Sequence, residues 1–460
     1  MSEKQLRVVM YPWFAIGHAT PFLHLANKLA EKGHIVTLLL PNKAKLLLQS
    51  SNLYPTLLNV QTIVVPHVDP LPPGTETLSD IPSNLETHLA TALDLFRPDF
   101  ESILNKLQPN LVIYDFAYWV PEAVLASGSK AKCVVYCVTY ASILALEMVP
   151  FRDPPKDRPV VAEDPCVACS TPPGYPSNMV MPFEDKNRIF LHSPYGEGVT
   201  FHHRVSTAIK CSDAIAIKTS REIEGKYCDY LSSQYNNKPV LTVLDMPEPK
   251  EVALEARWAE WLDKFTKASV IFCAFGSQVI LEVAQFQEIL LGFEMTNLPF
   301  LVAFKPPTGC ATVEEAFPKG FVNRVGERGV VTGEWVQQPQ ILAHPSVGCF
   351  VSHCGSGSIW ESMLSKNQIV LIPQLPDQKL FSKIIAEEVQ VGVQVERGED
   401  GSWVSKESLC NAVKSVMDEE SVVGKLVKKN HQIWRQKLVD PGYMRDNIDG
   451  FIKNLQALVG

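Results

Sequence analysis

The chain has 460 residues, more than a single hydrophobic core usually contains, so we expect two domains of about 200 residues each. A hydrophobic fraction of 46% and a charged fraction of 20% are typical of a globular protein, and the net charge of −8 argues against a nucleic-acid partner. The sequence has no apolar run of ~18 residues and no long apolar region near its start, so we expect a cytoplasmic protein without stable membrane insertion.

The first predicted strand covers residues 6–12 and is followed by a predicted helix. Thr20 and Pro21 are residue types favoured at the N-cap and at the first helical position, and Gly33 predicts the end of the helix. His18 would therefore lie in the loop beyond the carboxyl end of the strand, where open α/β sheets bind their ligands. Taken alone, a histidine in such a loop is more often incidental than functional.

A second apolar strand is predicted over residues 110–121, and Asp115 falls near its end among aromatic residues. A carboxylate in this position is costly to bury unless it pairs with a cation or an N–H group. His18 is the obvious partner, and a histidine that is oriented by a carboxylate can remove a proton from a hydroxyl. The two residues together predict a general base and the group that orients it.

Residues 335–378 contain the most informative pattern in the chain. An apolar strand over residues 347–353, a turn over 354–358 and a helix from 359 form an anion-binding arrangement, because the first N–H groups of a helix lack partners within it. Another apolar strand follows over residues 369–373. We expect a phosphate group to bind at the turn.

Four side chains indicate a nucleotide sugar rather than phosphate alone. Trp335 offers a flat face to a pyrimidine, His353 and Ser358 can donate to phosphate oxygens, and Glu361 can accept two hydrogen bonds from a ribose. Each residue also has a structural interpretation. Ser358 and Glu361 fit a capping box that would start a helix, while His353 and Trp335, taken singly, are more often structural.

The whole segment resembles the plant secondary product glycosyltransferase box, the donor-binding signature of plant family 1 UDP-glycosyltransferases. The resemblance implies a donor site formed by Trp335, Val336, Gln338, His353, Gly355, Ser356, Gly357, Ser358, Glu361, Asp377, Gln378 and, from the separate motif AFGSQ, Ser277. Trp335 would stack on the uracil, and Gln338 with Glu361 would hold the ribose. His353 and Ser358 would hold the diphosphate, and Asp377 and Gln378 the sugar. The chain has Ser356 and Gly357 where the family usually has tryptophan and asparagine.

The motifs GHATPF and YDF match family motifs at His18 and Asp115, where the family has its catalytic base and the aspartate that orients it. The resemblance implies that an acceptor hydroxyl attacks the anomeric carbon and inverts its configuration. It also implies no cofactor and no metal, because fixed dipoles neutralise the leaving diphosphate. Eleven scattered cysteines predict free thiols, and the one close pair, Cys166 and Cys169, has no second pair nearby to complete a zinc site.

The resemblance covers essentially the whole chain and implies an α/β protein of the GT-B type, with two Rossmann-like, doubly wound parallel-sheet domains facing a cleft. We place the acceptor-binding domain at residues 1–244, a linker at 245–256 and the UDP-sugar-binding domain at 257–440. Residues 441–460 predict a C-terminal helix, which the resemblance packs back on the first domain.

The motifs GHATPF, PPGYP, REIEG and WVQQP look most like the branch that extends the sugar of flavonoid, anthocyanin or phenylpropanoid glycosides. We therefore predict a monomer that transfers glucose, rhamnose or xylose from its UDP donor to a sugar hydroxyl of a phenolic glycoside. The expected acceptor residues are Trp13, Phe14, Phe116, Tyr118, Trp119 and Tyr140. Two alternatives stay open: glycosylation of the free aglycone, and a silent protein that binds nucleotide sugars or phenolics. A dinucleotide-dependent oxidoreductase would need G-x-G-x-x-G after the first strand, where Gly17 stands alone.

Overall fold

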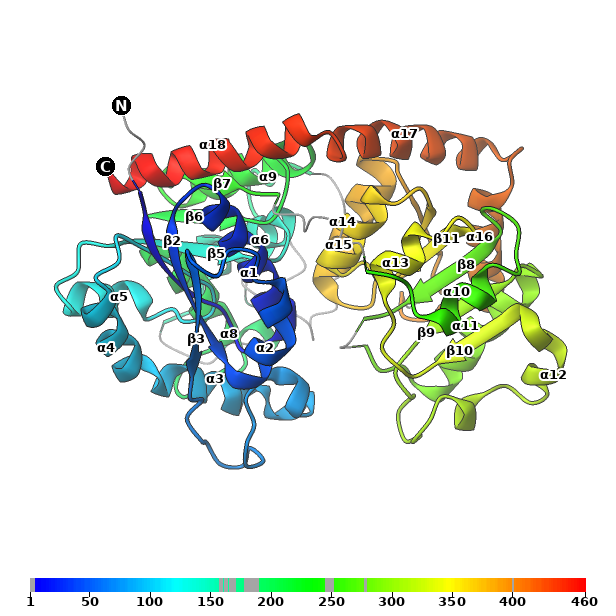
Figure 1. Ribbon diagram of the computed structural model, residues 1–460, viewed down its shortest axis with the longest axis horizontal. Coiled ribbons are helices and arrows are strands. Elements are labelled where there is room, and N and C mark those ends of the chain that lie inside the picture. The colour runs from blue at the N-terminus through cyan, green and yellow to red at the C-terminus, as the bar shows by residue number, and fades with distance from the viewer. Residues whose placement is uncertain are drawn as a thin grey trace. The chain divides into compact units, whose positions relative to one another are not determined.

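The computed structural model describes residues 5–156, 160, 164, 171–177, 190–244, 252–276, 279–398 and 401–460. The chain divides into two compact units, one formed by Met1–Pro247 with Met444–Gly460 and the other by Glu248–Tyr443. Each unit contains one parallel sheet with helices packed around it (Figure 1). Cys166 and Cys169 lie outside the described residues, and the nine cysteines that the structure describes are thiols rather than disulfides.

The first unit contains a parallel sheet of seven strands in the order β3-β2-β1-β4-β5-β6-β7. Its central strands are buried and apolar, as expected where crossover helices cover both faces of a parallel sheet. The strands are β1 (Arg7–Tyr11), β2 (Ile35–Pro41), β3 (Leu58–Ile63), β4 (Leu111–Tyr114), β5 (Lys132–Cys137), β6 (Ala214–Ile217) and β7 (Val240–Thr242). The helices are α1 (Ile16–Glu31), α2 (Asn42–Leu48), α3 (Glu86–Leu95), α4 (Arg97–Leu107), α5 (Val120–Ala126), α6 (Ala141–Glu147), α8 (Phe201–Cys211), α9 (Arg221–Gln234) and α18 (Pro441–Val459).

The order of the strands reverses between β1 and β4, which are hydrogen-bonded neighbours although they are far apart in the sequence. At such a point the connections leave toward opposite faces of the sheet and open a crevice at the carboxyl ends of the two strands. The segments that carry His18 and Asp115 follow these two strands.

Helix α1 begins earlier than the sequence predicts. Its N-cap is Ala15, whose carbonyl accepts from the N–H groups of His18 and Ala19, each at 2.9 Å, so the predicted N-cap at Thr20 is wrong. Pro21 lies inside the helix, where it removes one backbone N–H from the ladder. Ala15 has extended backbone angles and is the last residue before the helix, which begins at Ile16. His18 therefore lies in the first turn of α1 rather than in a loop.

One face of helix α1 is apolar and buried. Its side chains at positions 22, 25, 26 and 29 have no exposed surface and lie in one cluster with strands β1 and β2. Helix α18 adds Ile448, Phe451, Ile452 and Leu455 to the same cluster, and the backbone N–H of Leu244 donates to the side chain of Asn447 at 2.9 Å. Burial of four large side chains ties the end of the chain to the first unit.

The second unit contains a parallel sheet of six strands in the order β10-β9-β8-β11-β12-β13, so β8 and β11 stand where β1 and β4 stand in the first. The strands are β8 (Val270–Ala274), β9 (Phe300–Ala303), β10 (Gly329–Thr332), β11 (Val347–Ser352), β12 (Gln368–Leu371) and β13 (Val393–Gln394). The helices are α10 (Ala256–Leu262), α11 (Val283–Thr296), α12 (Phe321–Val325), α13 (Gln338–Ala343), α14 (Ser356–Leu364), α15 (Pro376–Lys383), α16 (Lys406–Met417) and α17 (Val422–Leu438). Among the described residues, no helix is both long and apolar enough to cross a membrane.

Candidate functional site

His18 and Asp115 are in direct contact at the point where the first sheet reverses its strand order. Nδ1 of His18 lies 2.7 Å from Oδ2 of Asp115, and the two side chains are 22% and 5% exposed. The other oxygen of Asp115, Oδ1, accepts from the backbone N–H groups of Trp13 and Phe116, each at 2.6 Å. Because the carboxylate accepts at Nδ1, the neutral imidazole keeps its lone pair at Nε2, the nitrogen that can take a proton.

Two of the predicted acceptor residues, Trp13 and Phe116, contact this pair, and a third, Phe14, stacks on Trp13. The ring of Phe116 meets the His18 ring edge-on at 5.3 Å between centroids, and Trp13 stacks on Phe116 at 5.5 Å and on Phe14 at 6.0 Å. Phe116 is partly exposed, whereas Trp13 and Phe14 are buried. The ring of Tyr195 also packs against Phe116 at 6.1 Å and against Trp13 at 6.0 Å. No local pattern in the sequence links Tyr195 to the strand ends.

The other three predicted acceptor residues are not brought to His18. Trp119 is 4% exposed, packs on Tyr11 in the core and donates from Nε1 to Asp94 at 2.9 Å. Tyr118 lies under the guanidinium of Arg204, 5.1 Å from ring centroid to Cζ. Tyr140 is 1% exposed and precedes helix α6.

In the second unit, Trp335 lies between strand β10 and helix α13, and Gln338 is the first residue of α13. Trp335 is 78% exposed, so the alternative that it belongs to the core is wrong, while Val336 is buried. The amide nitrogen of Gln338 donates to Oγ of Ser358 at 3.1 Å and to Oε2 of Glu361 at 2.6 Å. These bonds join the start of α13 to α14 and place three predicted donor residues side by side.

The capping-box interpretation of Ser358 and Glu361 is wrong. The N-cap of α14 is Gly355, and no side chain caps the helix. Helix α14 begins at Ser356, earlier than predicted, so Ser358 is its third residue and Glu361 lies one turn further along. Neither side chain is required to start the helix, and both face Gln338 instead.

His353 follows strand β11 and is held by glycines on two sides. Its Nδ1 lies 3.3 Å from the carbonyl of Ala274 at the end of β8, and burial lowers its pKa to about 4. A Cβ at Gly276 would lie 3.0 Å from Nε2 of His353, and a Cβ at Gly355 only 2.5 Å from it. Glycine is required at both positions for the imidazole to lie over the turn, and Gly276 also has a φ of 66°.

The start of helix α14 differs from the rest of the box in being small and open. Ser356 is its first residue, and its Oγ is buried without a hydrogen-bond partner within the described part of the chain. Gly357 is exposed, and a Cβ added there would meet no atom within 4 Å. The unpaired first N–H groups of this nine-residue helix and its dipole favour an anion at this end.

The last predicted donor residues lie at the start of helix α15. Oε1 of Gln378 accepts from the backbone N–H groups of Gln374 and Leu375, each at 3.0 Å, so its amide nitrogen is the part left for a ligand. Burial raises the pKa of Asp377 above its usual range, and backbone hydrogen bonds oppose that shift. Ser277 lies outside the described residues, next to Gly276.

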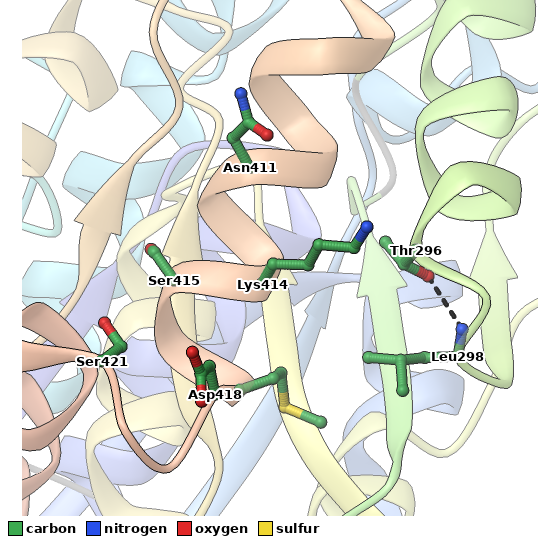
Figure 2. Close-up of a pocket in the computed structure, with 8 residues that line it drawn as sticks. Thr296, Leu298, Asn411, Lys414, Ser415, Asp418 and Ser421 are labelled. Atoms are coloured by element: carbon green, nitrogen blue, oxygen red, sulfur yellow. Dashed lines mark hydrogen bonds between the residues drawn. The ribbon is translucent and has the colours of Figure 1, made fainter.

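A separate surface pocket in the second unit is lined by Thr296, Leu298, Asn411, Lys414, Ser415, Met417, Asp418 and Ser421 (Figure 2). Its wall includes the end of α11 and the turn before β9, where the N–H of Leu298 donates to Oγ1 of Thr296 at 3.1 Å. This turn is at the amino ends of the strands, whereas His353 follows a carboxyl end. The pocket therefore contains none of the predicted site residues. No group of three or more histidine, cysteine, aspartate or glutamate side chains suited to a metal occurs within the described residues.

Residues 321–441 match the family described as UDP-glucoronosyl and UDP-glucosyl transferase. Similarity to individual proteins covers the whole chain. This chain is 54% identical to UDP-glucosyl transferase 79T1 of Saponaria officinalis, over 100% of both chains. It is 50% identical to the anthocyanidin 3-O-glucoside 2'''-O-xylosyltransferase of Arabidopsis thaliana, over 100% of this chain and 98% of that protein.

Solved structures of plant proteins share the two-sheet fold. UGT73P12 of Glycyrrhiza uralensis, in complex with glycyrrhetinic acid 3-O-monoglucuronide, matches with a TM-score of 0.78 over 99% of this chain and 96% of that one. UGT89C1 of Arabidopsis thaliana, in complex with UDP-L-rhamnose, matches with a TM-score of 0.75 over 98% and 100%. These TM-scores establish the GT-B fold. Both proteins are only 19% identical to this chain, so the likeness shows the fold alone.

Proposed function

Because this chain belongs to the plant family 1 UDP-glycosyltransferases, we propose that it transfers a sugar from UDP to a sugar hydroxyl of a phenolic glycoside, with inversion. The observation that carries the proposal is the contact of 2.7 Å between His18 and Asp115. It supplies the one thing that a neutral hydroxyl needs to become a nucleophile, which is a base with a fixed direction.

In the proposed reaction, the acceptor hydroxyl gives its proton to Nε2 of His18 while its oxygen attacks the anomeric carbon. The bond from that carbon to the diphosphate breaks, its electrons leave with UDP, and the configuration inverts. Asp115 stabilises the imidazolium that forms and keeps Nδ1 directed toward itself. The charge that develops on the leaving diphosphate is met by the N-terminus of α14 and by His353 and Ser358, so the proposal assigns no step to a metal or cofactor.

For the donor, we assign the exposed ring of Trp335 to the uracil and the linked pair of Gln338 and Glu361 to the ribose. A carboxylate can accept from both ribose hydroxyls at once, and Gln338 fixes its direction by donating to Oε2. Asp377 and the amide nitrogen of Gln378 are assigned to the sugar hydroxyls.

Two observations support an acceptor that is already a glycoside. One relative, 50% identical over the whole chain, is named a xylosyltransferase acting on an anthocyanidin 3-O-glucoside. Ser356 and Gly357 stand where the family usually has tryptophan and asparagine, and a Cβ added at Gly357 would meet no atom within 4 Å, which leaves room for a larger, polar acceptor. The partly exposed ring of Phe116 next to His18, with Trp13 stacked on it, suits the flat part of such an acceptor.

The experiment compares kcat/KM for a phenolic aglycone and for its own monoglucoside, with UDP-glucose, UDP-rhamnose and UDP-xylose offered in turn. We expect the monoglucoside to be preferred and NMR to show the new bond at a hydroxyl of its sugar. Equal or better use of the aglycone, or a product linked through a phenolic oxygen, would contradict the assignment of a sugar acceptor. The glycosyltransferase activity itself would be unaffected by that outcome.

A further inference from the structure

Arg204 on helix α8 is a fully buried cation that lies outside the predicted donor and acceptor sets. It is 0% exposed and forms a two-point ion pair with Asp94 on helix α3, with 2.8 Å from Nη1 to Oδ1 and 2.7 Å from Nη2 to Oδ2. Burying a charge is costly, and replacing such a pair with apolar side chains is often neutral or stabilising. Stability alone is thus a weak reason for the pair.

The other donors of Arg204 reach backbone carbonyls beside the catalytic pair. Nη1 donates to the carbonyl of Phe116 at 3.1 Å, while Nη2 and Nε donate to the carbonyl of Tyr195 at 2.9 and 3.2 Å. The N–H of Phe116 donates to Oδ1 of Asp115. Phe116 is therefore held at its carbonyl by Arg204 and at its N–H by Asp115.

The position of the guanidinium is closely determined. Oδ1 of Asp94 also accepts from Nε1 of Trp119 at 2.9 Å, which fixes the carboxylate from a third direction. A Cβ at Gly196 would lie 2.3 Å from Nη2 of Arg204, so the backbone at Gly196 packs closely against the guanidinium. Lysine has one nitrogen and no fork, so it cannot make the two bonds to Asp94 and reach both carbonyls.

We propose that the Asp94–Arg204 pair is a positioning device for the reaction. It fixes the peptide of Phe116, and through it the direction in which Asp115 faces His18, together with the Tyr195 segment whose ring lines the same aromatic cluster. The proposal rests on the proposed function, because it takes His18 as the base. Arg204 acts through Asp115 and Phe116 and does not itself touch substrate.

The first test is Arg204→Lys, compared with Arg152→Lys as a matched control. Arg152 is 1% exposed in the same unit and pairs with the buried Glu147 at 3.6 Å, so its replacement also alters a buried ion pair. We expect Arg204→Lys to lower kcat by about 10²-fold, the scale expected when catalytic groups are misplaced by about 1 Å. UDP affinity, measured by calorimetry, should stay unchanged, and Arg152→Lys should keep its kcat.

A double variant separates positioning from general loosening. If Arg204 acts through Asp115, then Arg204→Lys in the Asp115→Asn background should cause little further loss of kcat, because the contact that it orients is already gone. Full additivity of the two losses would overturn the proposal, and so would wild-type kcat in folded Arg204→Lys. If that variant does not fold, Asp94→Asn, which keeps the shape of the carboxylate, carries the same pair of measurements.

The failure of this proposal can be told from the failure of the proposed function. Loss of activity in His18→Ala together with normal activity in Arg204→Lys would remove the positioning role and leave the general base in place. Normal activity in His18→Ala would remove the base assignment itself.

Discussion

Asp115 has little freedom to turn away from His18, because both of its oxygens are engaged. Oδ1 accepts from two backbone N–H groups at 2.6 Å, and Oδ2 faces Nδ1 of His18 at 2.7 Å. Hydrogen bonds to an ionised group are stronger than those between neutral groups, so this arrangement also sets the direction of the imidazole. At the scale of single residues, the orientation of the predicted base is therefore set by Asp115.

The first prediction concerns this pair. His18→Ala should lower kcat by roughly 10²- to 10⁴-fold, the usual scale for loss of a general base, and Asp115→Asn should act in the same direction. UDP affinity should stay near that of the unaltered enzyme, because neither residue belongs to the donor set. The measurement is steady-state kinetics on the true acceptor, with calorimetry for UDP. Near-normal turnover in both variants would dismiss the pair as catalytic.

The second prediction concerns the proton on His353. At a pKa of about 4 the ring is neutral near pH 7, and if Nδ1 donates to the carbonyl of Ala274, Nε2 carries no hydrogen. Donation from Nε2 to a diphosphate then requires a second proton, so UDP binding should take up a proton and become tighter as pH falls from 7 toward 5. Calorimetry at pH 7 in two buffers of different ionisation enthalpy counts the protons. The same uptake in His353→Gln would assign it to another group.

At the scale of elements, the turn between β11 and α14 shapes the predicted phosphate site. The imidazole of His353 lies over Gly355, and helix α14, which follows, has no side-chain cap. Gly355 has an ordinary φ of −62°, so glycine is needed there for space and not for backbone freedom. The absence of a cap leaves the first N–H groups of α14 available to an anion.

The third prediction follows from that turn. Gly355→Ala should displace the imidazole of His353, because the added Cβ would lie 2.5 Å from Nε2, and UDP affinity should fall by about 10-fold, or about 1.4 kcal/mol. The control is Gly450→Ala in α18, where a Cβ meets nothing within 4 Å. Calorimetry and melting temperatures should show a selective loss of UDP binding in the first variant. Equal UDP affinity in both variants would mean that the imidazole is not part of the donor site.

At the scale of the whole molecule, the two units share one arrangement, in which functional candidates follow the two strands where the strand order reverses. The predicted base and its partner follow β1 and β4, and His353 and Gly276 follow β11 and β8, so each group lies where its sheet reverses strand order. Both units also bury histidines. Burial lowers the pKa of His202 to about 3, that of His353 to about 4, and that of His431 below its usual value.

The fourth prediction concerns acid stability. An unfolded histidine has a pKa of about 6.5. Below that pH the histidines of the unfolded chain bind protons, whereas these buried rings stay neutral in the folded protein. The free energy of unfolding is therefore undiminished by these histidines above about pH 6.5. It falls as the pH decreases toward the pKa values of the folded histidines, by up to about 1.4 kcal/mol per pH unit for each histidine. The check is urea denaturation at pH 7 and pH 5, where the midpoint should be lower at pH 5.

His202→Phe isolates one contribution to this pH dependence. His202 is 1% exposed, and neither ring nitrogen has a hydrogen-bond partner within the described part of the chain, so a phenyl ring should be tolerated. The variant should lose less stability between pH 7 and pH 5 than the unaltered protein. Other titrating groups are common to both proteins and cancel in the comparison. An unchanged pH dependence would contradict the assignment to His202.

The sequence by itself was enough to predict the buried strands, the strand, turn and helix around His353, and the contact between His18 and Asp115. These depend on local patterns: an apolar strand, a turn and a helix start place a side chain at the carboxyl edge of a sheet, whatever else surrounds it. The sequence places two helix starts too late, because α1 and α14 begin without a side-chain cap and the favoured cap residues lie inside them. Cap preference is a tendency that backbone geometry can override.

Only the tertiary structure decided which aromatic residues surround His18 and which charges hold them. Trp119 and Tyr140 are as aromatic as Trp13, yet they are buried elsewhere, while Tyr195 comes to the site from a distant segment. The pairing of Asp94 with Arg204 likewise joins two helices that no sequence pattern connects. Side-chain partners of this kind depend on which helices pack over which strand ends, and that is set by the whole sheet and not by neighbours along the chain.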